Sequence, residues 1–293
     1  MTFNYDYEKP KVIAEIGCNH MGNFEIAKEL VLLAKECGAS VAKFQKRDNK
    51  LLLTEQQYDG PHPVQENSFG DSYGSHREFL EFEQNQHAEL KKFCELKGME
   101  YSTSVWDVNS ALGISRLNPK FIKVPSACNN NYEMLEVLRD EYKGDIHISL
   151  GMTTQVEEMK IVKYFEENKQ SNKRLFLYAC TSAYPVPFNK VALLELKRLY
   201  NEYSIRVKGI GFSGHHLGIA VDIAAYVLGA RWIERHFTKD RTWKGTDHAA
   251  SLEPSGLMKL VRNLNASYEA LHFKDREILD VEIFQRDKLK YKK

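Results

Sequence analysis

Three histidines lie at the ends of two apolar segments in the last third of the chain. "IGFSGHHLGIA" spans residues 209–219 and "WIERHFTKD" spans residues 232–240. If these segments are neighbouring strands, about 4.8 Å apart, His215 and His236 can both reach one divalent metal ion. Adjacent residues of a strand point to opposite faces, so we expect His216 to face away or to cap the following helix. Two imidazoles with water and oxygen ligands suit Mn, Fe, Co or Zn.

Two lysines, Lys43 and Lys123, lie inside otherwise apolar segments. A buried ammonium group is unfavourable unless it is paired or faces an anion. Two such cations near several hydroxyl groups suit a phosphate or carboxylate ligand. Alternatively, one lysine could be a Schiff-base nucleophile with a depressed pKa. Both hypotheses are compatible with the sequence.

Strand-like and helical segments alternate along the chain, and they must position these side chains. The strand-like segments are residues 11–17, 40–46, 100–105, 121–126, 145–151, 174–182, 207–215 and 231–238. Amphipathic helical segments lie between them; in residues 23–38, for example, apolar residues recur at helical spacing and Gly38 ends the helix. The pattern therefore consists of about eight successive strand–helix units.

Eight units of this kind predict an α/β fold, a TIM (β/α)8 barrel with parallel strands. We expect residues 1–293 to form a single domain, with the barrel at about 10–272 and a short, solvated basic tail after it. An open doubly wound sheet is the alternative. That fold normally has a G-x-G-x-x-G turn after its first strand, and "EIGCNHMG" (15–22) does not contain one.

The catalytic groups of a TIM barrel lie at the C-terminal ends of the strands and in the loops that follow. The polar residues at these ends are Glu15, Lys43, Gln45, Thr103, Lys123, Ser126, Ser149, Ser182, Tyr184, Ser213, His215 and His236. Any one of them could fill the barrel interior as a hydrogen-bonded residue, but together they predict a site. Asp247, in the loop after the eighth segment, is either a ligand of a polyhydroxy substrate or a turn or N-cap residue.

A long connection, residues 47–82, separates the second strand from the second helix. Connections of this length in compact domains are usually functional lids or disordered insertions. This one leaves from the C-terminal end of a strand, so we expect it on the active-site face.

Composition excludes several classes of function. The net charge of +1 predicts no nucleic-acid partner, and no apolar run approaches the roughly 20 residues needed to span a membrane. The N-terminus has no apolar secretion signal. Five widely spaced cysteines without a C-x-x-C pair argue against disulfides and thiolate zinc sites, which indicates a cytoplasmic protein.

Several motifs resemble the sialic acid synthase (NeuB) family in order and spacing. They are "AEIGCNHMG", "AKFQK", "FIKVPSACNNN", "HISLGMTT", "CTSAYPVP", "GFSGHH" and "ERHFTKDRTWKGTDHAASLEP". The resemblance covers about residues 10–272. It implies a TIM barrel that condenses phosphoenolpyruvate with an open-chain aldose, commonly N-acetylmannosamine. The products would be a 2-keto-3-deoxy nonulosonic acid and inorganic phosphate.

The resemblance also implies residue roles and partners. It implies a divalent metal held by His215 and His236, usually Mn²⁺, with Mg²⁺ and Co²⁺ as alternatives. The matching phosphoenolpyruvate contacts are Lys43, Thr103, Lys123, Ser126, Ser149, Ser182 and Ser213, and the matching sugar contacts are Gln45, Tyr184 and Asp247. Glu15 matches an acidic residue of the family's first strand. The expected partners are the two small-molecule substrates and a second copy of the chain in a homodimer.

The sequence departs from the family pattern in its sugar half. Sialic acid synthases carry a C-terminal antifreeze-like (SAF) domain that supplies an arginine to the partner's site, and we expect no such domain here. Cys128 stands where a glutamate is common, and Ser182 stands where some members have asparagine. The acceptor is therefore expected to be a different sugar, or another chain completes the site.

Three hypotheses of function follow. The leading one is a metal-dependent, phosphoenolpyruvate-using synthase. The second is a Schiff-base pyruvate lyase or aldolase that uses Lys123 or Lys43. The third is a non-catalytic sugar-binding barrel.

Overall fold

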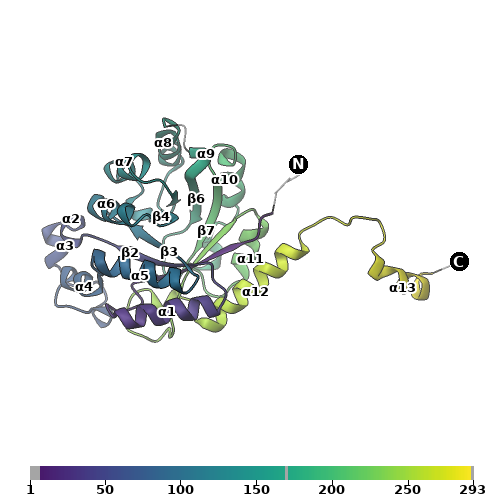
Figure 1. Cartoon of the computed structure of the whole chain (residues 1–293), viewed down its shortest axis with the longest axis horizontal. Coiled ribbons are helices and arrows are strands. Elements are labelled where there is room, and N and C mark those ends of the chain that lie inside the picture. The colour runs from purple at the N-terminus through teal and green to yellow at the C-terminus, as the bar shows by residue number, and fades with distance from the viewer. Residues whose placement is uncertain (1–6, 169–170, 292–293) are drawn as a thin grey trace.

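The computed structural model describes residues 7–168 and 171–291. Eight parallel strands form a closed barrel in which each strand pairs with the next and β8 pairs with β1 (Figure 1). The strands are β1 (Lys11–Gly17), β2 (Val41–Lys46), β3 (Glu100–Val105), β4 (Phe121–Val124), β5 (Asp145–Ser149), β6 (Leu175–Cys180), β7 (Gly209–Gly214) and β8 (Trp232–His236). The predicted TIM (β/α)8 barrel is confirmed.

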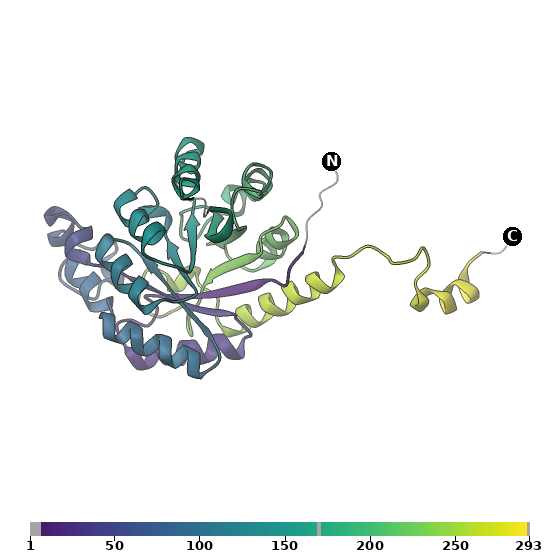
Figure 2. The ribbon, with the colours of Figure 1, turned by 45° about the horizontal axis from the view of Figure 1, so that its top comes forward.

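Helices surround the barrel (Figure 2). They are α1 (Phe24–Glu36), α5 (Gln84–Leu96), α6 (Val108–Leu117), α7 (Tyr132–Asp140), α8 (Gln155–Glu166), α9 (Ser171–Arg174), α10 (Glu195–Tyr203), α11 (Ala220–Val227) and α12 (Pro254–Ala270). The first helix illustrates why they form. Asn23 caps the amides of Glu25 and Ile26, the face with Leu30 and Val31 is buried, and Gly38 follows the C-terminus at a φ of +85°.

The barrel interior is divided into two layers. Near the N-terminal ends of the strands, apolar side chains fill it: Ile13, Val41, Phe121, Phe176, Tyr178 and Trp232. Two residues further along β1, β2, β4 and β8, the side chains on the same face are charged: Glu15, Lys43, Lys123 and Glu234. The apolar layer therefore closes the floor beneath the charged layer.

The long connection between β2 and α5 is ordered and mostly helical. It contains α2 (Asn49–Leu52), α3 (Glu55–Asp59), the 3-10 turn η1 (Gln65–Asn67) and α4 (Tyr73–Leu80). α4 packs tightly against the β1–α1 loop, because a Cβ on Gly22 would lie 2.3 Å from the carbonyl oxygen of Phe79. The Gly245 amide also donates to Asn67 Oδ1 at 3.4 Å. The connection is thus fixed to the loops after the first and last strands.

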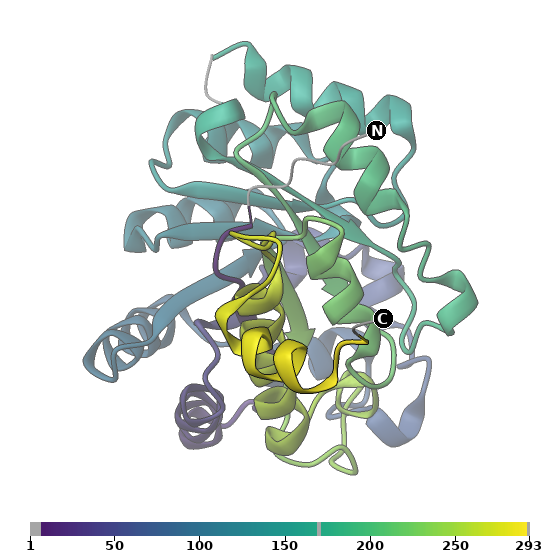
Figure 3. The same cartoon turned by 90° about the vertical axis from the view of Figure 1, so that its right-hand side faces the viewer.

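Beyond α12 the chain leaves the barrel. Residues 271–279 are extended and lead to α13 (Asp280–Leu289), which lies apart from the other helices (Figures 1 and 2). Seen from that side, the arm crosses in front of the barrel (Figure 3). Val281 and Phe284 of α13 are 83% and 70% exposed, so this helix buries almost none of its apolar surface.

The structure also bears on the expectations for the cysteines and for membrane-spanning segments. All five cysteines are free thiols, and Cys37, Cys94 and Cys128 are buried. Across residues 7–168 and 171–291, no helix has the length and apolar character needed to cross a membrane.

Ending the chain after Phe273 should leave the barrel intact, because α13 contributes little buried surface. The melting temperature, followed by circular dichroism, should change by less than about 2 °C. A control that ends after Met258 removes the buried Leu260 and Leu264 of α12 and should not fold. A drop above about 5 °C for the first truncation would mean that α13 packs on the barrel in solution.

Candidate active site

A cavity of about 260 Å³ opens at the C-terminal end of the barrel. The predicted site residues that line it are Glu15, Lys43, Gln45, Lys123, Ser126, Ser149, Ser182, Tyr184, Ser213, His215 and His236. All eight strands or the loops after them contribute to its lining. The side chains predicted from the strand ends therefore meet in one place.

Four buried charges form a continuous network at the bottom of this cavity. Lys43 Nζ lies 2.5 Å from Glu15 Oε2 and 3.7 Å from Glu234 Oε1, and Lys123 Nζ lies 3.0 Å from Glu234 Oε2. Each of these residues is less than a tenth exposed. Two ammonium groups thus neutralise two carboxylates, which makes their burial tolerable.

The two carboxyl groups of the network have pKa values shifted in opposite directions. Burial raises the pKa of Glu15, and Glu234 adds to this against the opposing effect of Lys43. Burial also disfavours ionised Glu234, but Lys123 and Lys43 outweigh it, and the pKa of Glu234 lies well below its ordinary value. When Glu15 carries a proton, the network has one net positive charge and attracts an anion.

Glu234 also belongs to this cavity, although it was not among the residues predicted from the strand ends. It lines the cavity and accepts a hydrogen bond from Ser213 Oγ at 3.2 Å. The signal was present in "WIERH", because Glu234 lies two residues before His236 and therefore points to the same side of the strand.

Hydroxyl groups cover the other side of the cavity. Ser126 Oγ accepts a hydrogen bond from the Gly151 amide at 2.9 Å. A Cβ on Gly151 would lie 2.3 Å from Ser182 Oγ and 2.8 Å from Ser126 Oγ, so a side chain there would displace both hydroxyl groups. This close approach leaves the two hydroxyls and Ser149 around a space that faces the lysines.

Thr103 is a wrong prediction. Its hydroxyl donates to Tyr101 Oη on the helix-facing side of β3, and it does not line the cavity. Its neighbour Ser104 points into the barrel instead, where it accepts a hydrogen bond from Lys43 Nζ at 2.7 Å. The error is one residue of register, which reverses the side of the strand.

The imidazoles of His215 and His236 lie next to each other, with ring centroids 5.6 Å apart. His215 Nδ1 donates to the carbonyl of Thr181 at 3.0 Å, which leaves its Nε2 lone pair free. Burial lowers the pKa of His215 to about 4, so the ring is neutral at pH 7. His236 Nδ1 is buried, and no residue among 7–168 and 171–291 forms a hydrogen bond with it.

The ring nitrogens of these two imidazoles are suited to bind a metal ion. A neutral ring with a free lone pair and a buried nitrogen without a partner are what ligation requires. Asp247 Oδ2 lies 3.9 Å from His236 Nδ1. Within the described residues, no group of three or more His, Cys, Asp or Glu side chains is arranged around a common metal position. The protein would thus supply two ligands, and water or substrate the others.

His216 points away from the cavity, as expected. It is fully buried, and its Nε2 lies 3.2 Å from Asp222 Oδ2 of α11 and 3.2 Å from Arg235 Nη1. Arg235 also bonds Asp222, at 2.5 Å. This buried group fixes the loop that carries His215.

Of the predicted sugar contacts, Gln45 and Tyr184 line the cavity, whereas Asp247 lies behind His236 and is not part of its lining. Gln45 Nε2 donates to Glu15 Oε1 at 2.7 Å, and the Tyr184 ring lies 4.2 Å from that of His215. Burial alone would raise the pKa of Asp247, but His236, Arg77 and Arg47 outweigh it and hold this pKa below its ordinary value. Asp247 is therefore an ionised acceptor of hydrogen bonds.

Cys128 lies in the short turn after β4 and does not line the cavity. Burial raises the pKa of its thiol to about 11. The thiol is therefore neutral, and this position adds no charge to the site.

The chain is similar in sequence to proteins of one known family. The sequence model of the NeuB family matches residues 30–276. The chain is 38% identical over 281 residues to N-acetylneuraminate-9-phosphate synthase of Homo sapiens, which covers 95% of this chain and 76% of the human protein. It is 30% identical to N,N'-diacetyllegionaminic acid synthase of Campylobacter jejuni, over 90% of this chain and 78% of that one.

A solved structure is similar over nearly its whole length. It is the N-acetylneuraminic acid (sialic acid) synthetase from Leptospira borgpetersenii in complex with citrate, with a TM-score of 0.80 and 26% identity. The similarity covers 97% of this chain and 94% of that one.

Replacing Glu234 with glutamine should destabilise the protein by about 3 kcal/mol at pH 7, because Lys123 loses its buried partner. Glu234 has a depressed pKa in the folded state, so its contribution is present above the unfolded value of about 4.3 and is lost as the pH falls below it. Urea unfolding should therefore show a stability difference that is full at pH 7 and smaller at about pH 3.

The matched control is Glu25→Gln, which removes the exposed partner of Lys28 on α1 and should change stability by less than about 1 kcal/mol. Both proteins keep Glu15, but Glu234 helps to raise the pKa of Glu15, so the comparison reports the two coupled carboxyl groups together. A stability difference that persists unchanged into acid would contradict the assigned charge of Glu234.

Proposed function

Because the chain belongs to the NeuB family, we propose that it condenses phosphoenolpyruvate with an open-chain aldose. The products are a sialic-acid-type 2-keto-3-deoxy nonulosonic acid and inorganic phosphate. The relatives named above are synthases of nonulosonic acids, by their own names. The enzyme is thus a transferase that forms a carbon–carbon bond.

The observation that carries this proposal is the composition of one cavity. Buried Lys43 and Lys123 lie on one side, serine hydroxyls on another, and the imidazoles of His215 and His236 at the mouth. Ammonium and hydroxyl groups suit the phosphate and carboxylate of phosphoenolpyruvate, and the imidazoles suit a metal beside the aldehyde. Different side chains would therefore bind phosphoenolpyruvate and the aldehyde.

The reaction joins C3 of phosphoenolpyruvate to the aldehyde carbon, and water adds at C2. The C2 hydroxyl then becomes the ketone of the product as the phosphate leaves. Lys43, Lys123 and the serines hold the anionic groups, and their fixed positions lower the entropic barrier to attack. Lys123 is itself fixed, since its Nζ lies 3.0 Å from Glu234 and 3.5 Å above the centre of the Tyr178 ring.

Glu15 and Asp247 have different protonation roles. Burial keeps a proton on Glu15 to higher pH than usual, so Glu15 can donate it within the site. Asp247, whose pKa is lowered, stays ionised and accepts hydrogen bonds from the sugar's hydroxyl groups. Carboxyl groups with opposite pKa shifts can divide acid and base work in this way.

A divalent metal, Mn²⁺ in the first instance, is part of the proposal. His215 Nε2 and His236 Nδ1, which accept no hydrogen bond from any residue that the structure describes, would hold it. When bound, such an ion acts as a Lewis acid toward the aldehyde oxygen.

A Schiff-base lyase is the second candidate, because burial lowers the pKa of Lys123. Against it, Lys123 Nζ lies 3.0 Å from Glu234 Oε2 and 3.5 Å from the centre of the Tyr178 ring, and the ion pair with Glu234 favours the protonated amine, which is not nucleophilic. Sequence relatives at 30% identity or more with known activity are synthases by name. The synthase is therefore favoured.

The proposal also includes a cellular compartment and an oligomeric state. We place the enzyme in the cytoplasm, where phosphoenolpyruvate is available and its five free cysteines stay reduced. We also propose a homodimer. Sedimentation that detects only a monomer at micromolar concentration would remove the second proposal.

Phosphate release from phosphoenolpyruvate should require an aldose, stop with a chelator and return with Mn²⁺. His215→Ala and His236→Ala should each lower the rate by about three orders of magnitude, because both would hold the metal. The control His272→Ala alters an exposed histidine after α12 and should have no effect. Tight phosphoenolpyruvate binding without turnover of any aldose would instead favour a non-catalytic sugar-binding barrel.

Borohydride should trap no adduct between pyruvate and the protein, since neither lysine acts as an amine nucleophile in this mechanism. Intact-mass spectrometry after reduction measures this directly. A reduced pyruvate adduct on Lys123 or Lys43 would favour the lyase instead.

A further inference from the structure

Arg47 follows β2 directly and lies next to the active-site cavity without lining it. Its side chain is 6% exposed, and its guanidinium carbon lies 3.9 Å from the centre of the Trp106 ring. Its Nη2 donates a hydrogen bond to Gln45 Oε1. Trp106 and Gln45 both line the cavity, so Arg47 can act on a bound ligand through these neighbours.

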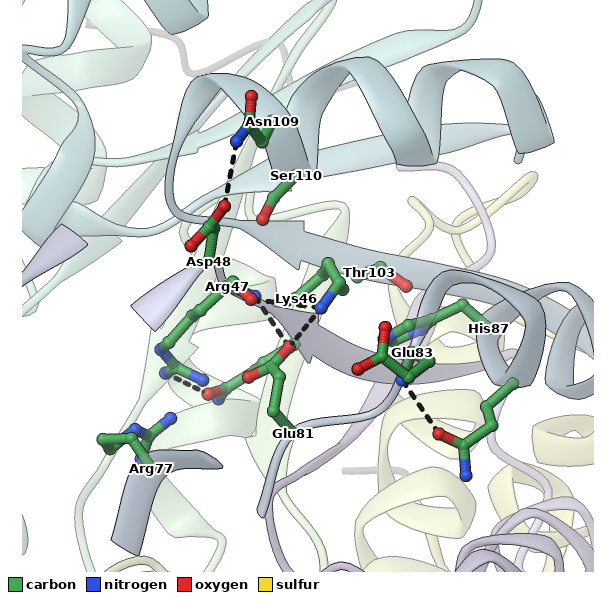
Figure 4. A network of polar contacts seen from close by, with 12 residues as sticks. Lys46, Arg47, Asp48, Arg77, Glu81, Glu83, His87, Thr103, Asn109 and Ser110 are labelled. Atoms are coloured by element: carbon green, nitrogen blue, oxygen red, sulfur yellow. Dashed lines mark hydrogen bonds and ion pairs between the residues drawn. The ribbon is translucent and has the colours of Figure 1, made fainter. Parts of the chain in front are cut away.

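Three parts of the chain hold Arg47 in place. Glu81 Oε1, between α4 and α5, accepts from the Arg47 amide at 2.8 Å and from Lys46 Nζ at 3.0 Å. Figure 4 shows Glu81 joined to Lys46 and to the main chain of Arg47, whose guanidinium group extends away from Glu81. That group stacks on Trp106, after β3, and donates through Nη1 to Cys18 Sγ, after β1, at 3.7 Å. Its position is therefore fixed from several directions.

The orientation of the Gln45 amide depends on such neighbours, because the last torsion of a glutamine has two settings of similar energy. A guanidinium group can only donate hydrogen bonds, so the Gln45 atom that faces Arg47 must be the oxygen Oε1. The nitrogen Nε2 then lies on the other side, where it donates to Glu15 Oε1 at 2.7 Å. Arg47 thus selects one of the two orientations.

Gly17, at the end of β1, leaves the space for this orientation. Its φ is +54°, and a Cβ there would lie 2.9 Å from Gln45 Nε2 and 3.2 Å from Glu15 Oε1. A side chain at this position would push the amide away from the carboxyl group. The absence of a side chain at Gly17 and the presence of Arg47 therefore favour the same placement of Gln45.

In this orientation Gln45 offers the cavity only one kind of group. Its oxygen accepts from Arg47, and the Cys18 thiol lies 3.7 Å from the same oxygen as a second donor. Its nitrogen carries two N–H groups: Glu15 accepts from one, and no described residue accepts from the other. A ligand in the cavity therefore meets an N–H donor at Gln45, and the ligand atom opposite it must be a hydrogen-bond acceptor.

We propose that Arg47 is a positioning residue that holds Gln45 as a hydrogen-bond donor to an oxygen of the acceptor aldose. This rests on the proposed function, since Gln45 is among the residues expected to contact the acceptor sugar. Without Arg47 the amide can turn and present its oxygen to the cavity. The acceptor should then bind less tightly, whereas the lysines and serines assigned to phosphoenolpyruvate keep their places.

The test is a double-mutant cycle of Arg47→Met and Gln45→Ala in the full chain. Phosphate release is measured with phosphoenolpyruvate, an N-acylmannosamine and Mn²⁺. Each single variant should raise KM for the aldose by about 10-fold, the effect of one lost hydrogen bond. Adding Arg47→Met to Gln45→Ala should change this KM by less than about 2-fold, because Arg47 acts through the amide. KM for phosphoenolpyruvate should stay within about 2-fold of wild type throughout.

Controls separate positioning from support of the fold. Arg47→Lys keeps one donor that can face Gln45 Oε1, and it should recover part of the affinity for the aldose. Arg262→Met, on the exposed face of α12, should behave as wild type. If Arg47→Met does not fold, Arg47→Lys replaces it in the cycle, and its smaller loss should likewise vanish beside Gln45→Ala. Additive losses in the double variant, or equal losses for both substrates, would overturn the proposal.

A second measurement does not depend on turnover. In protein labelled with ¹⁵N at glutamine side chains, the NMR signal of Gln45 is the one that Gln45→Ala removes. Wild type and Arg262→Met should show it with slow hydrogen exchange, and Arg47→Met should move it toward the signals of exposed glutamines, with faster exchange. An unchanged signal in Arg47→Met would refute the positioning role. A changed signal without turnover of any aldose would support that role and count against the proposed function.

Discussion

The burial of two lysines inside the barrel is the constraint on which the rest of the site depends. Lys43 and Lys123 are tolerable there only because Glu15 and Glu234 lie beside them, and each carboxylate comes from a strand at the closure of the barrel. The pairing fixes the ammonium groups, and it leaves the protonation of Glu15 to decide whether the cluster is neutral or positive. Anion binding and proton availability are thus coupled in one group of side chains.

The sequence was sufficient for the fold and for most of the cavity. The strand–helix period predicted the barrel, and the rule that strand ends meet at one face brought together residues as distant as Glu15 and His236. It failed where a single residue of register matters, as with Thr103 and Ser104, because both are small polar residues of the same strand. It also failed at Glu234, whose role depends on Lys123, 111 positions away in the chain.

The groups in the proposed site come partly from strands and partly from loops. Of those proposed to hold phosphoenolpyruvate, Lys43, Lys123, Ser149 and Ser213 lie on strands, whose positions the barrel geometry fixes. Of those proposed to contact the acceptor, Tyr184 and Asp247 lie in the loops after β6 and β8. Loops can change without altering the barrel, so the acceptor is the part of the reaction that can differ among proteins with this fold.

The position of Glu234 in the last strand has a consequence for how the chain is made. Residues 43 and 123 are synthesised long before residue 234, so a growing chain holds both lysines without their shared carboxylate. Seven strands alone would bury an unpaired cation, which disfavours a closed interior before β8 is added. The ion network therefore makes the final strand a checkpoint in assembly: an unfinished chain has neither a stable interior nor a working site.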